Sequence, residues 1–254
     1  MLLTLDISNT SIKAGVFRGD DLLANWRLAT ERQKLTDDYA MLLLGLLQTA
    51  GLPASEIDGV SMSCVVPPLR SVFDELARKY LHVTALIVGP GIKTGVKLAV
   101  DNPREVGADR VVNSLATHRL YGGPAIAIAF GTATVFDCVS AQGEYLGGAI
   151  APGVVTALES LTRSAAQLFQ VELVRPPKAI GKNTVHTMQS GIVLGFAGLV
   201  EGLVKRLKSE LGDKAKVIAT GGLADVIAPA TDVIDVVDQH LTLKGLKLIY
   251  ELNA

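Results

Sequence analysis

Cysteine and histidine are scarce in this chain of 254 residues, and each scarcity argues against a kind of site. Cys64 and Cys138 are the two cysteines, and they form no C-x-x-C pair. We therefore expect reduced thiols in a cytosolic protein and no disulfide framework. The histidines are His82, His118, His186 and His240. Because they are scattered along the chain, we expect no zinc cluster.

No charge of either sign is in excess, and long apolar runs are lacking. Lys and Arg number 24 and Asp and Glu 25, for a net charge of -1. This balance argues against a basic nucleic-acid face and a polybasic membrane patch. The most apolar stretch, residues 122–136, is interrupted by glycines and threonines, so it predicts two buried strands rather than a membrane span. The first ten residues lack a charged region, so we expect no signal peptide and a cytoplasmic protein without nucleic-acid or membrane partners.

Apolar residues make up 49% of the chain, enough to fill a large core. Turn residues and apolar periodicity divide the first half into three strands, a helix, a strand, a helix, a strand and a helix. Their expected ranges are 2–7, 12–18, 22–29, 36–51, 60–66, 68–80, 85–88 and 102–120. In the last of these, Asn102 followed by Pro103 and Glu105 is typical of a helix start.

The second half repeats the order of elements that opens the first. The first half opens with a strand, a turn from Asp6 to Thr10, a second strand, another turn and a third strand. The second half opens in the same way, with a strand at 124–130, a Gly131-Thr132 turn and two further strands. The offset between Ser8 and Gly131 is 123 residues, close to half the chain. Helices are expected at 154–169, 184–211 and 241–252, and a strand at 216–219. The repeat predicts a duplicated α/β protein with a cleft between its halves, which we place at residues 1–118 and 119–254.

The first hairpin has the side chains that phosphoryl transfer from a nucleotide requires. Consecutive backbone N–H groups in a tight turn form a concavity that binds anions. Asp6, at the end of the first strand, would approach Mg²⁺ through water. Thr10 could donate its hydroxyl to phosphate, and Lys13 could neutralise phosphate charge. An aspartate at a strand end is also ordinary turn chemistry, so Asp6 by itself leaves both interpretations open.

Two further glycine turns fit the same chemistry. Gly131 permits close backbone approach, so Gly131 and Thr132 could hold the phosphates from the second hairpin. Gly221 and Gly222 follow a strand and precede a helix, where an adenosine could lie against the backbone. Each turn taken alone could also be an ordinary connection. Their pairing with the first hairpin predicts nucleotide binding.

Five segments in order give the chain a specific resemblance. They read DISNTSIK, NPREVGADR, FGTATVFD, GGAIAPG and ATGG, and they span nearly the whole sequence. This set is similar to that of type III pantothenate kinases, and the NPREVGADR segment is the most diagnostic. The resemblance implies a duplicated ribonuclease H-like fold of the actin-like ATPase kind, with two similar lobes around a nucleotide cleft. It also implies a homodimer that uses ATP and Mg²⁺ to phosphorylate pantothenate at the first step of coenzyme A synthesis.

The resemblance assigns roles to individual residues. Asp109 falls on the proposed general base, and Arg110 would hold the pantothenate carboxylate, a task suited to a planar bidentate donor. Thr132 matches an ATP contact, and Thr184 a substrate contact that reaches toward a partner subunit. The remaining matched positions are Asp6, Ser8, Asn9, Thr10 and Lys13 for ATP phosphates, and Gly107 and Ala108 for pantothenate.

Two positions depart from the family pattern. Ser8 stands where the family has glycine, and it would be strained if the position needs a positive φ. Ala129 stands where the family has an aspartate that binds a monovalent cation, K⁺ or NH₄⁺. We therefore expect an active kinase without a potassium requirement. A weakened enzyme, a non-catalytic nucleotide-binding regulator and a kinase for another small hydroxy acid remain as alternatives.

Overall fold

The computed structural model describes residues 1–254, which fold into two compact units. The first contains Met1–Gly95, Arg104–Ala116 and Thr242–Ala254, and the second contains Val96–Pro103 and Thr117–Leu241. The lobes expected from the sequence are continuous stretches, whereas the first unit gathers three separate ones. The C-terminal segment belongs to the first unit because it packs on the first sheet.

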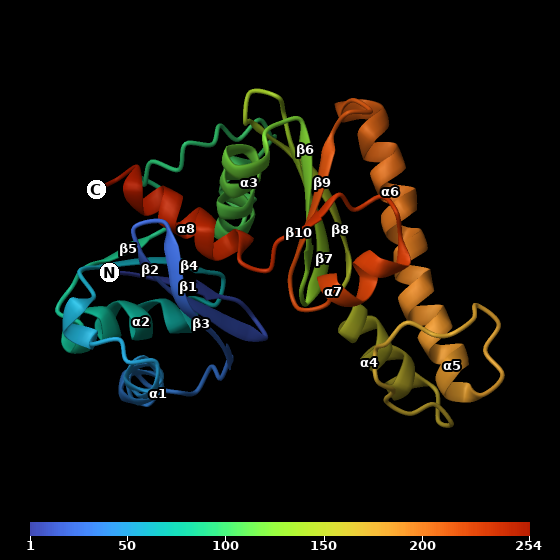
Figure 1. The fold of residues 1–254 in the computed structure, drawn as a ribbon, viewed down its shortest axis with the longest axis horizontal. Coiled ribbons are helices and arrows are strands. Elements are labelled where there is room, and N and C mark those ends of the chain that lie inside the picture. The colour runs from blue at the N-terminus through green and yellow to red at the C-terminus, as the bar shows by residue number, and fades with distance from the viewer. The chain divides into compact units, whose positions relative to one another are not determined.

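A five-stranded mixed sheet forms the centre of the first unit (Figure 1). Its strands are β1 (Leu2–Ile7), β2 (Ser11–Arg18), β3 (Asp21–Ala29), β4 (Gly59–Cys64) and β5 (Ala85–Ile87), in the order β3-β2-β1-β4-β5. β1 and β2 pair antiparallel, as do β2 and β3, whereas β4 runs parallel to β1 and β5 parallel to β4. The central strand β1 is buried from its second residue onward, which explains its nearly continuous apolar sequence.

The second unit repeats this sheet strand for strand. It consists of β6 (Ala125–Phe130), β7 (Ala133–Val139), β8 (Tyr145–Pro152), β9 (Lys216–Thr220) and β10 (Val236–Val237). The order β10-β9-β6-β7-β8 is the order of the first sheet read from the other edge. β6 and β7 form an antiparallel hairpin, and β9 runs parallel to β6. The duplicated α/β fold predicted from the sequence is therefore confirmed.

Helices cover both faces of the first sheet. Figure 1 shows α1 (Thr36–Thr49) and α2 (Pro67–Tyr80) on one face and α8 (Leu241–Glu251) on the other. The rings of Tyr39 in α1 and Phe73 in α2 lie 4.8 Å apart, measured between centroids, and both side chains are buried. These aromatic rings therefore anchor the two helices to each other over the sheet.

Helix α8 is fixed to the first sheet by packing and by a hydrogen bond. A Cβ added to Gly15 in β2 would lie 2.9 Å from a Leu243 methyl carbon, so the helix approaches the strand closely. The buried Ser61 hydroxyl in β4 donates to the Leu246 carbonyl oxygen at 2.8 Å. The last helix of the chain therefore completes the core of the unit in which the chain begins.

Helix α3 begins later than the sequence indicates. The expected helix start at Asn102 is wrong: Pro103–Glu105 forms one 3₁₀ turn, and α3 spans Ala108–Tyr121. The carbonyl oxygen of Gly107 accepts hydrogen bonds from the backbone N–H groups of Arg110 and Val111 at 3.1 and 3.3 Å. Gly107 therefore caps the helix, and the chain turns sharply just before the residues of functional interest.

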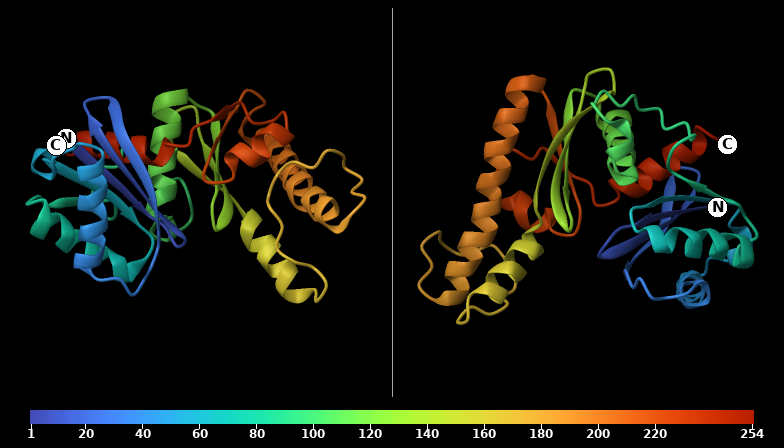
Figure 2. Two further views of the ribbon diagram at one scale, coloured as in Figure 1. Left: turned by 60° about the horizontal axis from the view of Figure 1, so that its bottom comes forward. Right: turned by 180° about the vertical axis from the view of Figure 1, so that it is seen from behind.

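The second unit is covered by α4 (Val154–Ser164), α5 (Thr184–Gln189), α6 (Gly195–Leu211) and α7 (Ala224–Ile227). A π-helical turn at Ser190–Leu194 joins α5 to α6, and Figures 1 and 2 show the two as one long helix. The helix expected at 184–211 is therefore present, with a π turn in it. The helix expected at 154–169 is shorter and ends at residue 164.

By length and composition, the long helix Thr184–Leu211 could cross a membrane, although no such segment was expected from the sequence. Its most apolar window has a mean hydropathy of 1.4, and 44% of that window is buried within the protein. Phe196, Val200 and Val204 of α6 are buried in the core of the second unit. The helix thus has the apolar residues of a core helix, and a core helix can be as long and as apolar as a membrane span.

Candidate functional site

The first hairpin is held in shape by residues that follow β3. Thr30 donates its hydroxyl to the Ser8 carbonyl oxygen at 2.7 Å and its backbone N–H to the Thr10 carbonyl oxygen at 3.1 Å. Arg32 donates to the Asn9 side-chain oxygen at 2.9 Å. These supports could not be predicted from the sequence, because they depend on how β3 returns along β2. They fix the turn whose backbone amides are candidates for phosphate binding.

Ser8 is accommodated without the strain that its replacement of glycine suggested. His82 is the one non-glycine residue of the chain with a positive φ, so Ser8 has an ordinary backbone conformation. Its hydroxyl lies 3.5 and 3.4 Å from the two carboxylate oxygens of Asp6. Serine therefore fits this turn and adds a weak polar contact to Asp6.

Asp6 is a buried carboxylate at the end of β1, with 5% of its surface exposed. Lys13 lies opposite it on β2, and Ser63 lies beside it on β4. The Ser63 hydroxyl donates to Asp6 Oδ1 at 2.9 Å. Burial raises the pKa of Asp6, while the Lys13 charge and the hydroxyls of Ser63 and Ser8 oppose this rise.

This carboxylate fits the requirements of a magnesium site. Mg²⁺ in nucleotide sites is usually bound by one or two carboxylates together with phosphate oxygens and waters. The chain contains no group of three or more His, Cys, Asp or Glu residues that could hold a metal by themselves. Asp6, beside a turn rich in backbone donors, is suited to a metal that arrives with its nucleotide.

The structure brings Asp109 close enough to Asp6 for their charges to interact. Asp109 is the second residue of α3, and its carboxylate accepts hydrogen bonds from the backbone N–H groups of Asp109 and Arg110. Burial is the main cause that raises the pKa of Asp109, and the charge of Asp6 raises it further. The helix-start N–H groups and the Arg110 charge act in the opposite direction. A carboxylate in this setting is a stronger base than an ordinary aspartate.

Gly107 and Ala108 place the Asp109 side chain. A Cβ added to Gly107 would lie 2.6 Å from Asp109 Oδ1, so the carboxylate folds back over the glycine. Any larger residue at 107 would displace it. The predicted segment from Gly107 to Arg110 is therefore gathered with Asp6 in the first unit, and its glycine sets the position of the predicted base.

We expect Gly107→Ala to reduce kcat by about 10²-fold, because a displacement of about 1 Å at a reacting group has effects of that size. The fold should tolerate the change, because the clash is with the end of a flexible side chain. Steady-state kinetics and a melting curve would test both parts. The matched control is Gly45→Ala in α1, where an added Cβ meets nothing within 4 Å. Equal kinetics for the two variants would contradict the prediction.

The second hairpin is supported by the start of α4. The Thr132 carbonyl oxygen accepts hydrogen bonds from the Gly153 N–H at 3.1 Å and the Thr156 hydroxyl at 2.9 Å. A Cβ added to Gly153 would lie 2.4 Å from the carbonyl oxygens of Gly131 and Thr132, so only glycine fits there. Gly153 is the last residue of the GGAIAPG segment, and its role could not be read from the segment alone. In the structure Gly153 lets the start of α4 contact the second hairpin.

Gly221 is in a conformation that strongly favours glycine. Its φ is +98°, and an added Cβ would lie 2.4 Å from the carbonyl oxygen of Phe130. Its own carbonyl oxygen accepts a hydrogen bond from the Ala224 N–H at 3.1 Å. The turn with Gly222 therefore passes directly over the end of β6, within the same unit as Gly131 and Thr132.

The second sheet lacks the charged cluster of the first. Ala129 occupies the strand position of Asp6, with Val135 opposite it and Thr220 beside it. The buried Thr220 hydroxyl has no hydrogen-bond partner. The side chains of Ala129 and Val135 offer no oxygen, so this strand end does not fit a monovalent-cation site of the kind that the resemblance implies.

Thr184 lies on the surface of the second unit. It is the exposed first residue of α5, after Asn183, whose side-chain oxygen caps the helix by accepting from the His186 N–H at 2.8 Å. The role of Thr184 toward substrate or a partner subunit stays a prediction.

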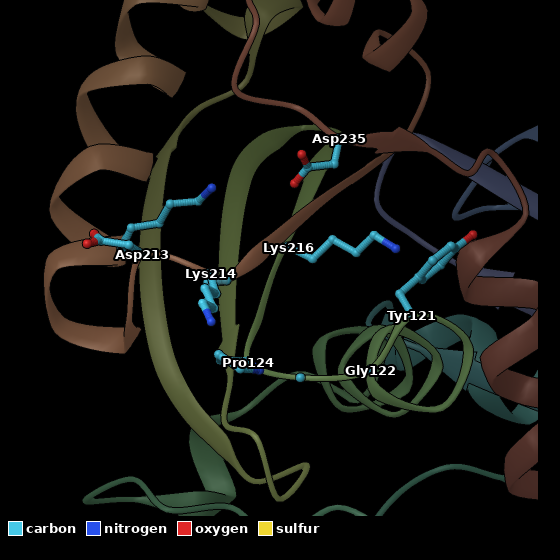
Figure 3. A pocket seen from close by; sticks show the side chains of 10 residues that line it. Tyr121, Gly122, Pro124, Asp213, Lys214, Lys216 and Asp235 are labelled. Carbon is cyan, nitrogen blue, oxygen red and sulfur yellow. The ribbon is translucent and has the colours of Figure 1, made fainter.

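A separate cavity of about 450 Å³ lies in the second unit, where Lys208, Lys214 and Lys216 are among its lining residues (Figure 3). Lys216 extends toward Tyr121, with its nitrogen 5.6 Å from the ring centroid. Lys216 pairs with the first residue of β6, whereas Thr220 pairs with Ala129 near the strand's other end. The cavity therefore lies at the opposite end of the second sheet from the hairpin and is not part of the candidate site.

Two equivalent mixed sheets, each with a turn at the end of its central strand, define a protein of the sugar-kinase and actin-like ATPase fold. The solved inorganic polyphosphate/ATP-glucomannokinase from Arthrobacter sp. strain KM is similar, with a TM-score of 0.56, 15% identity, and coverage of 100% of this chain and 99% of that one. A Baf family transcriptional activator structure from Campylobacter jejuni gives a TM-score of 0.57 at 15% identity, covering 99% and 97%. Likeness at this identity shows the fold alone.

The chain belongs to the type III pantothenate kinase family, whose model matches residues 2–206. The type III pantothenate kinase of Roseiflexus sp. (strain RS-1) is 56% identical over 253 residues, covering 100% of this chain and 99% of that protein. The type III pantothenate kinase of Moorella thermoacetica is 53% identical over 254 residues, covering 100% of both. The family resemblance drawn from the sequence is confirmed.

Proposed function

We propose that this protein transfers the γ-phosphoryl group of ATP to the hydroxyl group of pantothenate, giving 4′-phosphopantothenate in the first step of coenzyme A synthesis. The observation that carries the proposal is the pairing of Asp109, on a helix start, with Asp6, at a phosphate-type hairpin, in one compact unit. Relatives of more than half identity are named as kinases for this substrate. No observation favours the regulatory alternative.

In this reaction the pantothenate hydroxyl oxygen forms a bond to the γ-phosphorus of ATP. The bond from that phosphorus to the bridging oxygen breaks, and ADP leaves with the bridging oxygen. The hydroxyl proton passes to the Asp109 carboxylate, which also orients the hydroxyl. In a loose transition state this orientation contributes as much as the basicity of the carboxylate.

Other residues bind and hold the substrates. Arg110 has a planar guanidinium suited to the pantothenate carboxylate. The turn residues Ser8, Asn9 and Thr10, with Lys13, would hold phosphate oxygens. Bound Mg²⁺ would neutralise phosphate charge, with Asp6 as its protein carboxylate. In the second unit, Gly131 and Thr132 would contact phosphates, and Gly221 and Gly222 the adenosine.

An ADP-release assay with ATP, magnesium and a panel of small hydroxyl compounds tests the substrate. Pantothenate should support turnover, and hydroxy acids or sugars of similar size should not. Turnover with another member of the panel but not with pantothenate would reassign the substrate. ATP binding without any turnover would reject the kinase proposal.

We expect the turnover rate to change by no more than about twofold when sodium is replaced by potassium at equal ionic strength, where screening is the same. The reason is that Ala129 supplies no cation ligand. Ala129→Asp should make the rate potassium-dependent, because a carboxylate there can accept from the unpartnered Thr220 hydroxyl and bind a cation. A large potassium activation of the unmodified protein would contradict this expectation.

We also propose that the protein works as a cytoplasmic homodimer. Its two cysteines, Cys64 and Cys138, form no disulfide, which fits a reducing compartment. Analytical ultracentrifugation would give twice the chain mass of 26.7 kDa if the dimer forms. A sedimenting species of one chain mass at micromolar concentration would reject it.

A further inference from the structure

A buried hydroxyl on the neighbouring strand holds the carboxylate of Asp6. Ser63 in β4 is the parallel-strand partner of Asp6, and its hydroxyl donates to Oδ1 at 2.9 Å. Ser63 is fully buried, with 0% of its surface exposed. Because water cannot replace the bond, breaking it would leave a buried charged acceptor short of a donor.

The other hydroxyl near Asp6 is less well placed. Ser8 lies on the turn, is only partly buried, and sits 3.5 and 3.4 Å from the two oxygens, at the outer limit of hydrogen bonding. Ser63 lies inside a regular strand that is paired with β1. The rigid donor is therefore Ser63, which engages Oδ1.

We propose that Ser63 is a positioning residue that aligns the Asp6 carboxylate for the metal-bound nucleotide. This inference rests on the proposed function of Asp6 in a kinase. A donor fixed on Oδ1 restricts rotation of the carboxylate and leaves Oδ2 for water or ligand. Residues that orient metal-binding carboxylates in this way control metal affinity without touching the metal.

The second unit provides an internal comparison. The residue equivalent to Ser63 is Thr220, which pairs with Ala129. Its hydroxyl is buried and has no partner, and the strands β6 and β9 pair nevertheless. A hydroxyl at this position is therefore not needed for strand pairing. It makes a hydrogen bond in the unit that carries the aspartate.

The test compares Ser63→Ala with Ser61→Ala. Ser61 is equally buried on the same strand, but its hydroxyl donates to a carbonyl oxygen of α8. Calorimetry would measure ADP affinity with magnesium and with EDTA. We expect Ser63→Ala to reduce the magnesium-dependent part of the affinity by about 10–100-fold, with the affinity in EDTA unchanged. Ser61→Ala should change neither. In kinetics, Ser63→Ala should raise the magnesium concentration for half-maximal rate while kcat at saturating magnesium is largely kept.

A third variant keeps the test decisive if Ser63→Ala does not fold. Ser63→Cys is nearly isosteric and retains a weak donor, so its magnesium dependence should fall between those of wild type and Ser63→Ala. Equal magnesium dependence in Ser63→Ala and Ser61→Ala, or wild-type dependence in Ser63→Cys, overturns the inference. If wild type does not phosphorylate pantothenate while Ser63→Ala still weakens magnesium-linked ADP binding, the inference stands and the substrate assignment falls.

Discussion

Asp109→Asn is expected to lower the turnover of pantothenate by about 10²–10⁴-fold, the usual contribution of a positioned general base. The amide keeps the size of the side chain but cannot accept the hydroxyl proton. Asp101→Asn, an exposed aspartate in the connection before α3, is the matched control and should retain full activity. Activity of Asp109→Asn within tenfold of wild type would remove Asp109 from the catalytic role.

The same variant should be more stable than wild type at neutral pH. The pKa of Asp109 is raised in the folded protein, so ionisation at neutral pH opposes folding. The penalty is absent at pH values well below the unfolded pKa of about 3.9, grows as the pH rises from that value to the raised folded pKa, and is constant above it. The melting temperature of Asp109→Asn should therefore exceed that of wild type at pH 8, and the difference should shrink as the pH falls toward the unfolded pKa. For a chain of this size, each kcal/mol added to the free energy of unfolding raises the melting temperature by about 2–4 °C.

The pH–rate profile follows from the same shift. The base must be ionised, so the acidic limb of kcat/KM should lie above the ordinary aspartate pKa of about 3.9. The charge of Asp6 contributes to the raised pKa of Asp109. A limb at or below the ordinary value would show that Asp109 is not the titrating base.

Gly221→Ala is expected to destabilise the second unit by roughly 2–4 kcal/mol and to abolish measurable ATP binding. The φ of +98° strains any other residue, and the new methyl group would clash with the backbone of Phe130. The clash is with backbone at the end of β6, so either the strand end or the turn must move. Chemical denaturation and calorimetric titration of ATP would measure the two effects.

The control for this variant is Gly198→Ala in α6. An added Cβ there meets nothing within 4 Å, and alanine favours a helix, so a gain of about 0.5–1 kcal/mol is expected. If Gly221→Ala has the same free energy of unfolding and the same ATP affinity as wild type, the turn at Gly221 is not rigid. If it is unstable but still binds ATP, Gly221 serves the fold and not the nucleotide.

The sequence predicted most of the strands because their signals are local. β1 and β2 were expected within a residue of their observed bounds, since apolar runs ended by turn residues mark buried strands. The duplication was visible because both halves place their turns at the same spacing. The start of α3 was missed because Asn102 and Pro103 resemble a helix start, whereas the Gly107 carbonyl makes the first helical hydrogen bonds.

The supports of the candidate site could not be predicted in the same way. Ser63 contacts Asp6 from β4, and Thr30 contacts the first hairpin from the segment after β3. Gly153 contacts the second hairpin from the position before α4. Nothing next to these residues in sequence signals the contacts. The interaction between Asp6 and Asp109 likewise depends on where α3 packs in the first unit. The family resemblance supplied Asp109 as a residue, and the structure supplies the burial and the charge that raise its pKa.

The placement of α8 makes the first unit depend on a segment that is distant in sequence. The first unit joins Met1–Gly95 to Thr242–Ala254, whereas Thr117–Leu241 belongs to the second unit. Until Thr242–Ala254 packs, the face of the first sheet around Gly15 and Ser61 lacks its covering helix. Because contacts between such distant residues close a long loop, their formation is entropically costly and slow. The second unit needs no part of Thr242–Ala254, so its sheet and helices can form without waiting for this long-range contact.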